Sequence, residues 1–121
     1  MKITILTVGK IKEKYFTDAI KEYTKRLSRY CKLEIIEVAD EKTPDNASEH
    51  EEDLIRQKEG ERLQKYIKEG AYVISLAIEG KQYPSEDFSR KIHNLGLHGE
   101  SHLIFVIGGS IGLDKKILQN S

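Results

Sequence analysis

Several residue patterns are missing from this 121-residue chain, and each absence excludes a class of protein. The chain contains one cysteine, Cys31, so it cannot form an internal disulfide. No apolar run approaches the roughly 20 residues that a membrane-spanning helix needs. Met1 to Ile5 lead directly into structure without the apolar core of a signal peptide. We therefore expect a cytoplasmic protein with no membrane partner.

Motifs for metal binding, nucleophilic catalysis and the common nucleotide sites are missing as well. The four histidines have no cysteine or carboxylate partners at metal-ligand spacing. No Ser, Cys or Thr has an evident histidine partner that would activate it as a nucleophile. The chain has no P-loop pattern and no G-x-G-x-x-G after its first strand. We expect neither a metal site nor hydrolysis, and the sequence identifies no catalytic side chain.

The net charge of zero gives no sign of a nucleic-acid partner, but the charges are unevenly distributed. Residues 1–32 contain nine Lys or Arg against three acids, a net charge of +6. Residues 33–61 contain eleven acids against three bases, a net charge of −8. Lys10 and Lys12, which follow the first predicted strand, are our candidates for contacts with RNA phosphates. The alternative is that both segments are solvated helix surfaces that partly compensate each other.

Hydrophobic periodicity predicts a single α/β domain over residues 1–121, in which strands and helices alternate. Strand-to-strand spacing of this kind predicts right-handed crossovers and a mainly parallel sheet with helices on both faces. Strands are expected at 3–8, 33–38, 72–78 and 102–107, and helices at 15–30, 48–67, 85–95 and 113–118.

Three features refine this arrangement. Ser48 with Glu51 is a capping-box pair that predicts the start of a helix, which we expect to end before Gly70. Glu34 and Glu37 indicate that the second strand lies toward an edge of the sheet. Each helix has an apolar side that is expected to cover the sheet. These sides comprise Tyr15, Phe16, Ala19, Ile20, Tyr23, Leu27 and Tyr30; Leu54, Ile55, Leu63, Tyr66 and Ile67; Phe88, Ile92 and Leu95; and Leu113, Ile117 and Leu118.

Two of the apolar strands end in glycines. The strand at 72–78 leads into Gly80, and the strand at 102–107 leads into Gly108, Gly109 and Gly112. Ligands of parallel sheets bind at the carboxyl ends of the strands, where glycine lets the backbone approach a bound molecule. The pattern therefore favours a ligand site at this edge. The alternative is that the glycines only turn the chain.

Seven segments, in order along nearly the whole chain, together resemble one known family. They are Thr7 to Tyr15, Glu22 to Leu27, Asp40 to Pro44, Glu59 to Arg62, Leu76 to Lys81, Ser85 with Glu86, and Phe105 to Leu113. As a series they are similar to the ribosomal RNA large subunit methyltransferase H family, within the SPOUT-class or knotted methyltransferases. The resemblance implies a SPOUT-like fold and a homodimer.

The same resemblance implies an activity and a site. It implies transfer of a methyl group from S-adenosylmethionine to N3 of a pseudouridine in large-subunit ribosomal RNA, on assembled ribosomes. By position, it implies cofactor binding by Leu76 and Gly108, with Gly109 as their neighbour. The alternatives are core packing for Leu76 and a simple turn for Gly108. We expect a valine at Gly108 to occupy the cofactor position without disturbing the fold.

One departure from the family concerns the C-terminus. Members of the family continue beyond the position of Ser121 with the segment that forms the knot and completes the cofactor site and the dimer interface. We expect a chain that ends at Ser121 to be inactive and to assemble differently. Two other classes of function stay open: a non-catalytic RNA- or ribosome-binding module, and a flavodoxin-like nucleotide-binding domain.

Overall fold

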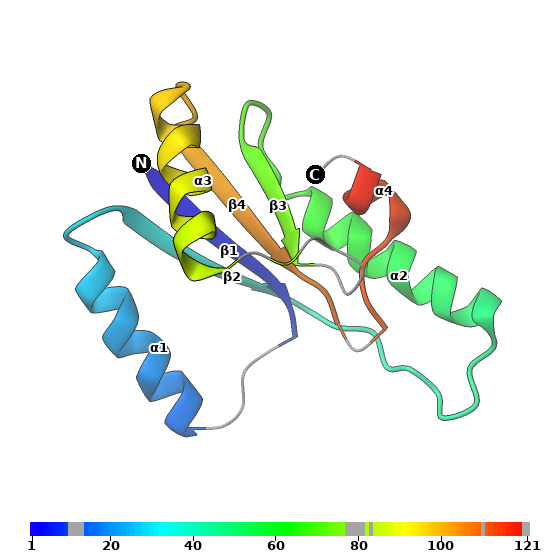
Figure 1. The fold of residues 1–121 in the computed structure, drawn as a ribbon. Coiled ribbons are helices and arrows are strands. Elements are labelled where there is room, and N and C mark those ends of the chain that lie inside the picture. The colour runs from blue at the N-terminus through cyan, green and yellow to red at the C-terminus, as the bar shows by residue number, and fades with distance from the viewer. Residues whose placement is uncertain (10–13, 77–81, 83, 110, 120–121) are drawn as a thin grey trace.

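The structure, a computed structural model, describes residues 1–9, 14–76, 82, 84–109 and 111–119. Within these ranges four strands alternate with four helices, so the predicted order is confirmed (Figure 1). The end of the third predicted strand, beyond Leu76, lies outside the described residues. The elements are β1 (Lys2–Val8), α1 (Lys14–Leu27), β2 (Lys32–Val38), α2 (Glu49–Gln64), β3 (Tyr72–Leu76), α3 (Ser85–Leu97), β4 (His102–Ile107) and α4 (Lys115–Gln119).

The strands form one parallel sheet in the order β2-β1-β4-β3. β2 lies at an edge, as Glu34 and Glu37 predicted, and β1 and β4 are central. A flavodoxin-like sheet instead places its third strand beside its first. Here β4 pairs with β1, and β3 lies outside it. The strand order therefore contradicts the flavodoxin-like alternative.

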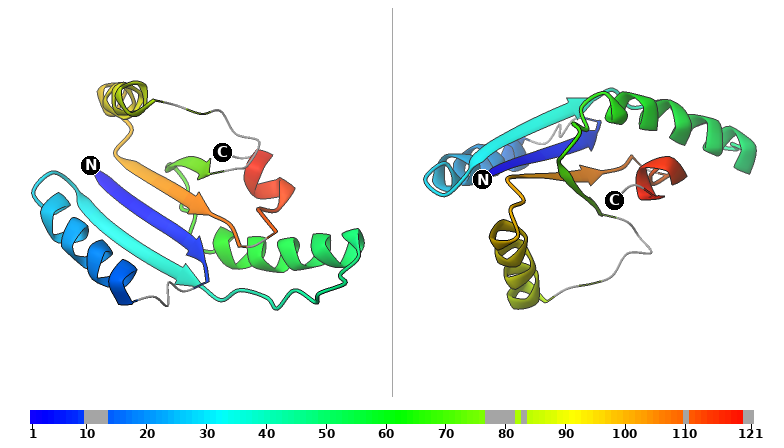
Figure 2. Two further views of the ribbon diagram at one scale, coloured as in Figure 1. Left: turned by 60° about the horizontal axis from the view of Figure 1, so that its bottom comes forward. Right: turned by 90° about the horizontal axis from the view of Figure 1, so that it is seen from above.

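The direction of each crossover decides which face its helix covers. Moving from β1 to β2 and from β3 to β4 takes the chain one way across the sheet, and moving from β2 to β3 takes it the other way. Because such crossovers are right-handed, α2 lies on the face opposite to α1 and α3. Figure 2 shows α2 and α3 on opposite sides of the sheet. Helix α4, which follows β4, shares a core cluster with α2. The helices that follow β1 and β4 therefore lie on opposite faces, which places the switch point of the sheet between these two strands.

The core lies between the sheet and the α2 side. Leu6, Ile104 and Val106 on the central strands are fully buried, together with Leu63 of α2. Ile117 of α4, which is 2% exposed, belongs to the same cluster. Burying an aliphatic side chain of this size contributes about 1.5–3 kcal/mol. This cluster therefore holds α2 and α4 against the carboxyl half of the sheet, next to the glycines that follow β4.

Helix α2 begins as the sequence predicts but ends earlier. Ser48 Oγ accepts a hydrogen bond of 3.1 Å from the Glu51 backbone N–H, and the Glu51 side chain returns to the Ser48 backbone N–H, which completes the capping box. The helix ends at Gln64, not at Ile67. The reason is that the next hydrogen bonds span three residues, with Tyr66 N–H donating to the Leu63 carbonyl, which tightens the chain into a turn.

The other face of the sheet is covered less completely than predicted. Tyr23 and Tyr30, expected to pack on the sheet, are 63% and 80% exposed. The physical reason is that α1 lies beside the edge strand β2 (Figure 1), where little sheet is available to cover. In α3, Phe88 contacts Phe105 of β4 at a ring distance of 6.0 Å. The predicted buried faces are corrected as follows: Ala19, Leu27, Leu54, Tyr66 and Leu118 are exposed, and Phe88, Ile92 and Leu95 are half-buried.

A small polar cluster lies at the amino-terminal edge of the sheet. Thr4, which is 1% exposed, places its Oγ1 2.9 Å from His102 Nε2 and 3.5 Å from Glu34 Oε1. Lys2 Nζ lies 3.8 Å from the other oxygen of Glu34. Burial, together with the positive charges of Lys2 and Lys68, lowers the pKa of His102 below its usual range. The neutral imidazole is therefore the form that this cluster stabilises.

Candidate functional site

A cavity of about 400 Å³ lies at the carboxyl ends of β3 and β4. Leu76, Gly108 and Gly109, the three cofactor-binding residues predicted from the sequence, all line it. Lys10 and Lys12, the candidates for RNA contacts, lie outside the described residues. The remaining lining residues come from α2, from the end of β4 and the loop after it, and from α4, and they are Asp53, Arg56, Ile107, Ile111, Gly112, Leu113, Lys115 and Leu118.

The loop after β4 folds closely on itself. A Cβ at Gly108 would lie 2.9 Å from both the carbonyl carbon and the carbonyl oxygen of Gly112. Gly112 has a φ of +88°, in the left-handed region, and its N–H donates to the Gly109 carbonyl at 3.1 Å. Gly108 therefore permits a backbone contact within the loop, and Gly112 permits the turn. The expectation that a valine at Gly108 would leave the fold undisturbed is wrong, because its side chain would collide with the loop backbone before it reached a ligand.

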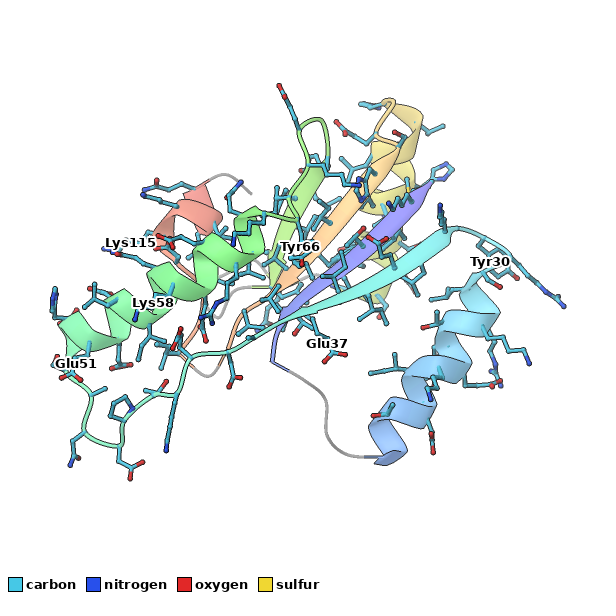
Figure 3. The ribbon with its side chains drawn as sticks, turned by 180° about the vertical axis from the view of Figure 1, so that it is seen from behind. Tyr30, Glu37, Glu51, Lys58, Tyr66 and Lys115 are labelled. Carbon is cyan, nitrogen blue, oxygen red and sulfur yellow. The ribbon has the colours of Figure 1, made fainter. Side chains whose placement is uncertain are left out.

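Helix α2 fixes the position of this loop. Arg56 Nη1 donates to the Ile111 carbonyl at 3.0 Å, and Nη2 pairs with Asp53 Oδ1 at 2.5 Å. The hydrogen bond from Arg56 lowers the pKa of Asp53 below its usual range, and the charge of Lys115 acts in the same direction. Figure 3 shows Lys115 on α4 beside α2. On the α2 wall of the cavity, the charges of Asp53 and Arg56 thus pair with each other.

Glu59, one turn further along α2, is a buried carboxyl beside the same loop. It is 4% exposed, and its Oε2 accepts a hydrogen bond of 3.0 Å from the Glu41 backbone N–H. Its Oε1 has no hydrogen-bond partner in the part of the chain that the structure describes. A Cβ at Gly109 would lie 3.2 Å from Oε1 and 3.3 Å from Oε2. Burial raises the pKa of Glu59 above its usual range, and the negative charge of Asp40 adds to this effect.

Glu59, Arg56 and Asp53 were not predicted from the sequence as site residues. One signal was available for Glu59, because it lies four residues after Ile55 and four before Leu63, both core residues of the same helix. A glutamate in the middle of a buried stripe is unusual enough to be a candidate site residue. Arg56 gave no such signal, since its partner Ile111 is 55 residues away in sequence.

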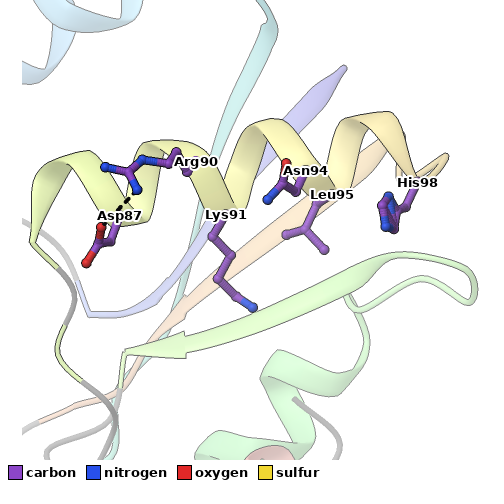
Figure 4. A pocket seen from close by; sticks show the side chains of 6 residues that line it. All are labelled: Asp87, Arg90, Lys91, Asn94, Leu95 and His98. Atoms are coloured by element: carbon purple, nitrogen blue, oxygen red, sulfur yellow. Dashed lines mark ion pairs between the residues drawn. The ribbon is translucent and has the colours of Figure 1, made fainter.

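A second cavity of about 400 Å³ lies along α3 (Figure 4). Its lining residues are Asp87, Arg90, Lys91, Asn94 and Leu95 of that helix and His98, its C-cap. Arg90 is engaged by Asp87 at 3.7 Å and by Glu86 at 4.0 Å. No strand end or glycine loop contributes to this cavity. We therefore place the candidate site at the β3 and β4 ends.

Within the described ranges, no group of three or more His, Cys, Asp or Glu side chains could hold a metal ion. Over the same residues, no helix has the length and apolar character that crossing a membrane requires. The cavity combines apolar walls, open glycine backbone and the Asp53–Arg56 pair, and the buried Glu59 lies behind Gly109 of its wall. Such a site can bind and orient a small organic ligand.

The fold and the cavity define an α/β protein with a ligand site at the carboxyl edge of a parallel sheet. All residues, 1–121, match the family described as "Predicted SPOUT methyltransferase". The chain therefore belongs to the SPOUT methyltransferase family, as the ordered motifs indicated.

Individual relatives support the same membership. Over 121 residues the chain is 62% identical to "Ribosomal RNA large subunit methyltransferase H" of Bifidobacterium adolescentis. It is 60% identical to the protein of that name from Clostridium tetani, and 55% identical to the one from Clostridium kluyveri. Each alignment covers 100% of this chain and 76% of the relative.

Proposed function

We propose that this chain transfers a methyl group from S-adenosylmethionine to N3 of a pseudouridine in large-subunit ribosomal RNA. The main support is that Leu76, Gly108 and Gly109 line one cavity at the carboxyl edge of the sheet. Membership of a methyltransferase family and the names of its relatives support the reaction class and the kind of substrate.

The residues that line the cavity fit a nucleoside-containing cofactor. The volume of about 400 Å³ lies within the range of about 300–1,000 Å³ that is usual for small-molecule sites. Leu76, Ile107 and Leu118 provide apolar surface for a base and for methylene groups. At Gly112 a Cβ would meet no atom within 4 Å, so a ligand has room to approach the backbone there closely.

This chemistry makes modest demands on side chains. S-adenosylmethionine supplies a methyl group that is already activated by the positive charge on sulfur. The contribution of the protein is then to hold donor and acceptor in line and to exclude water. A loop fixed by Arg56 and formed largely of glycine backbone suits that task, because its position is set by α2 and not by the ligand.

Replacing Leu76 with tryptophan tests the site. Leu76 is 53% exposed at the end of β3, so the larger side chain should extend into the cavity without disrupting the core. We expect affinity for S-adenosylmethionine, measured by calorimetry, to fall roughly tenfold or more, since the new ring occupies ligand volume. Methyl transfer to ribosomes that lack the modification should fall with it.

The matched control is Leu97→Trp, at a residue of α3 that is 70% exposed and does not line the cavity. It should leave affinity and methyl transfer unchanged. Equal affinity in the Leu76 variant and the wild type would contradict the proposed site. Cofactor binding without methyl transfer by wild-type protein that carries the family's C-terminal segment would contradict the proposed reaction.

A double replacement of Lys10 and Lys12 with alanine tests RNA binding. If both lysines neutralise phosphates, ribosome binding should weaken and the slope of log K against log salt should decrease by about 1.5. Cofactor affinity should not change. The control is the double replacement of Lys21 and Lys25 with alanine. Both lysines are exposed on α1, and their replacement removes the same amount of charge. An identical salt slope in the two double variants would contradict specific phosphate contacts by Lys10 and Lys12 and would favour the alternative that they belong to a solvated surface.

A further inference from the structure

Glu59 is a carboxyl group whose surroundings do not account for its charge. It lies where the ends of three strands meet, because Val8 ends β1, Glu41 follows β2 and Gly109 follows β4. A buried oxygen without a hydrogen-bond partner is costly, and an ionised one is more costly still. Such a group in a folded protein calls for a specific explanation.

The charges around Glu59 do not compensate it. Asp40 and Glu41, in the segment after β2, are both negative and raise its pKa, although the Glu41 backbone N–H lowers it. The charge of Arg62 lowers this pKa, but its guanidinium pairs with the Glu41 carboxylate and donates to the Ala39 carbonyl. Arg56 on the other side is occupied by Asp53 and Ile111. Across the part of the chain that is described, no cation forms an ion pair with Glu59.

Only the backbone of the glycine loop separates this carboxyl from the cavity. Gly109 lines the cavity, and both carboxyl oxygens of Glu59 lie closer than ordinary van der Waals contact to the position its Cβ would have. Charges separated by so little material interact strongly when water is excluded between them. A positive charge on a ligand in the cavity would therefore stabilise the ionised form of Glu59.

We propose that Glu59 makes the site prefer a positively charged sulfonium ligand over the neutral thioether left after methyl transfer. The proposal rests on the proposed function and deepens it. Loss of the methyl group removes the positive charge from the ligand, so the attraction to Glu59 ends with the transfer. The residue thereby favours binding of the donor and release of the product.

Calorimetric titration with S-adenosylmethionine and with S-adenosylhomocysteine tests this assignment in Glu59→Gln. Glutamine keeps the size of the side chain and an oxygen that can accept from the Glu41 N–H, but it has no charge. We expect affinity for the sulfonium to fall roughly fivefold or more, as for one charge interaction in a partly buried site. Affinity for the neutral thioether should stay within about twofold of wild type, because only charge has been removed.

Two further variants sharpen the result. Glu61→Gln, two residues away on an exposed part of α2, is the matched control and should leave both affinities unchanged. Asp53→Asn removes the carboxylate that lines the cavity directly. If the preference for the sulfonium collapses in Asp53→Asn and not in Glu59→Gln, the assignment to Glu59 is wrong. An equal loss of both affinities in Glu59→Gln would show a structural role only.

A measurement on the wild type alone supplies an independent test. The raised pKa means that Glu59 in the free protein keeps its proton to a pH above the ordinary glutamate value of 4.5. As pH rises through this range, affinity for the sulfonium should increase relative to the thioether, and the ratio should be flat in Glu59→Gln. Titration of groups that the two ligands share changes both affinities equally, so it does not affect this ratio.

The outcomes also separate this proposal from the proposed function. If the wild type binds neither ligand, both proposals fail. If it binds both ligands and the affinity ratio of Glu59→Gln equals that of the wild type at every pH, only the role of Glu59 is lost.

Discussion

Replacing Gly108 with valine is expected to abolish measurable binding of S-adenosylmethionine and to destabilise the protein. The new Cβ would lie 2.9 Å from the Gly112 carbonyl group and from Leu113 Cγ. Backbone atoms cannot move aside as the end of a long side chain can, so the loop must shift as a whole. Overpacking of this kind costs about 1–3 kcal/mol. The displaced loop would no longer shape the cavity wall, which calorimetry and urea unfolding would both report.

The control for this variant separates a collision from general backbone strain. Gly99 has a φ of +90° with no atom within 4 Å of a Cβ, and it lies in the turn after α3. Gly99→Ala should therefore cost about 1–2 kcal/mol through its left-handed backbone alone, with no loss of cofactor affinity. Wild-type affinity in a folded Gly108→Val variant would show that this loop does not form the site.

The positions of the strands were predictable because a continuous run of apolar side chains indicates a buried strand. Runs such as Phe105 to Ile107 are apolar without alternation, which happens when both faces of a strand are covered. The edge position of β2 was also predictable, since Glu34 and Glu37 would be costly in a central strand. The strand order was not predictable, because it depends on how far each crossover travels, and the residues of a strand do not encode that distance.

Some residues of the candidate site were likewise predictable from the sequence, and others were not. Leu76 and the glycines were found because they immediately follow strands, and parallel strands bring their carboxyl ends together. Arg56 and Glu59 were missed because their roles arise from contacts with the loop after β4, across about half the chain. Helical periodicity marks a face but does not say what that face meets. The exposure of Tyr23 and Tyr30 on α1 illustrates the same limit, since their stripe is apolar and yet extends past the sheet edge.

Truncating Leu6 to alanine is expected to lower the free energy of unfolding by about 3 kcal/mol. Leu6 is fully buried in the central strand β1, within the cluster that includes Leu63 of α2 and Ile117 of α4. Its removal leaves a cavity between the sheet and the two helices that position the glycine loop. Urea unfolding should show a lower midpoint with an unchanged m-value, because the folded and unfolded states differ by nearly the same surface.

The control for Leu6→Ala is Ile35→Ala in the neighbouring strand β2. Ile35 points to the opposite, less covered face and is 37% exposed, so its truncation should cost about 1 kcal/mol. A clear difference between the two variants follows from a sheet whose stability comes mainly from the face that α2 and α4 cover. Equal losses would show that α1 and α3 cover the other face as completely, contrary to the exposure of Ile35, Tyr23 and Tyr30. The loop of the candidate site would then depend on both layers and not on the α2 side alone.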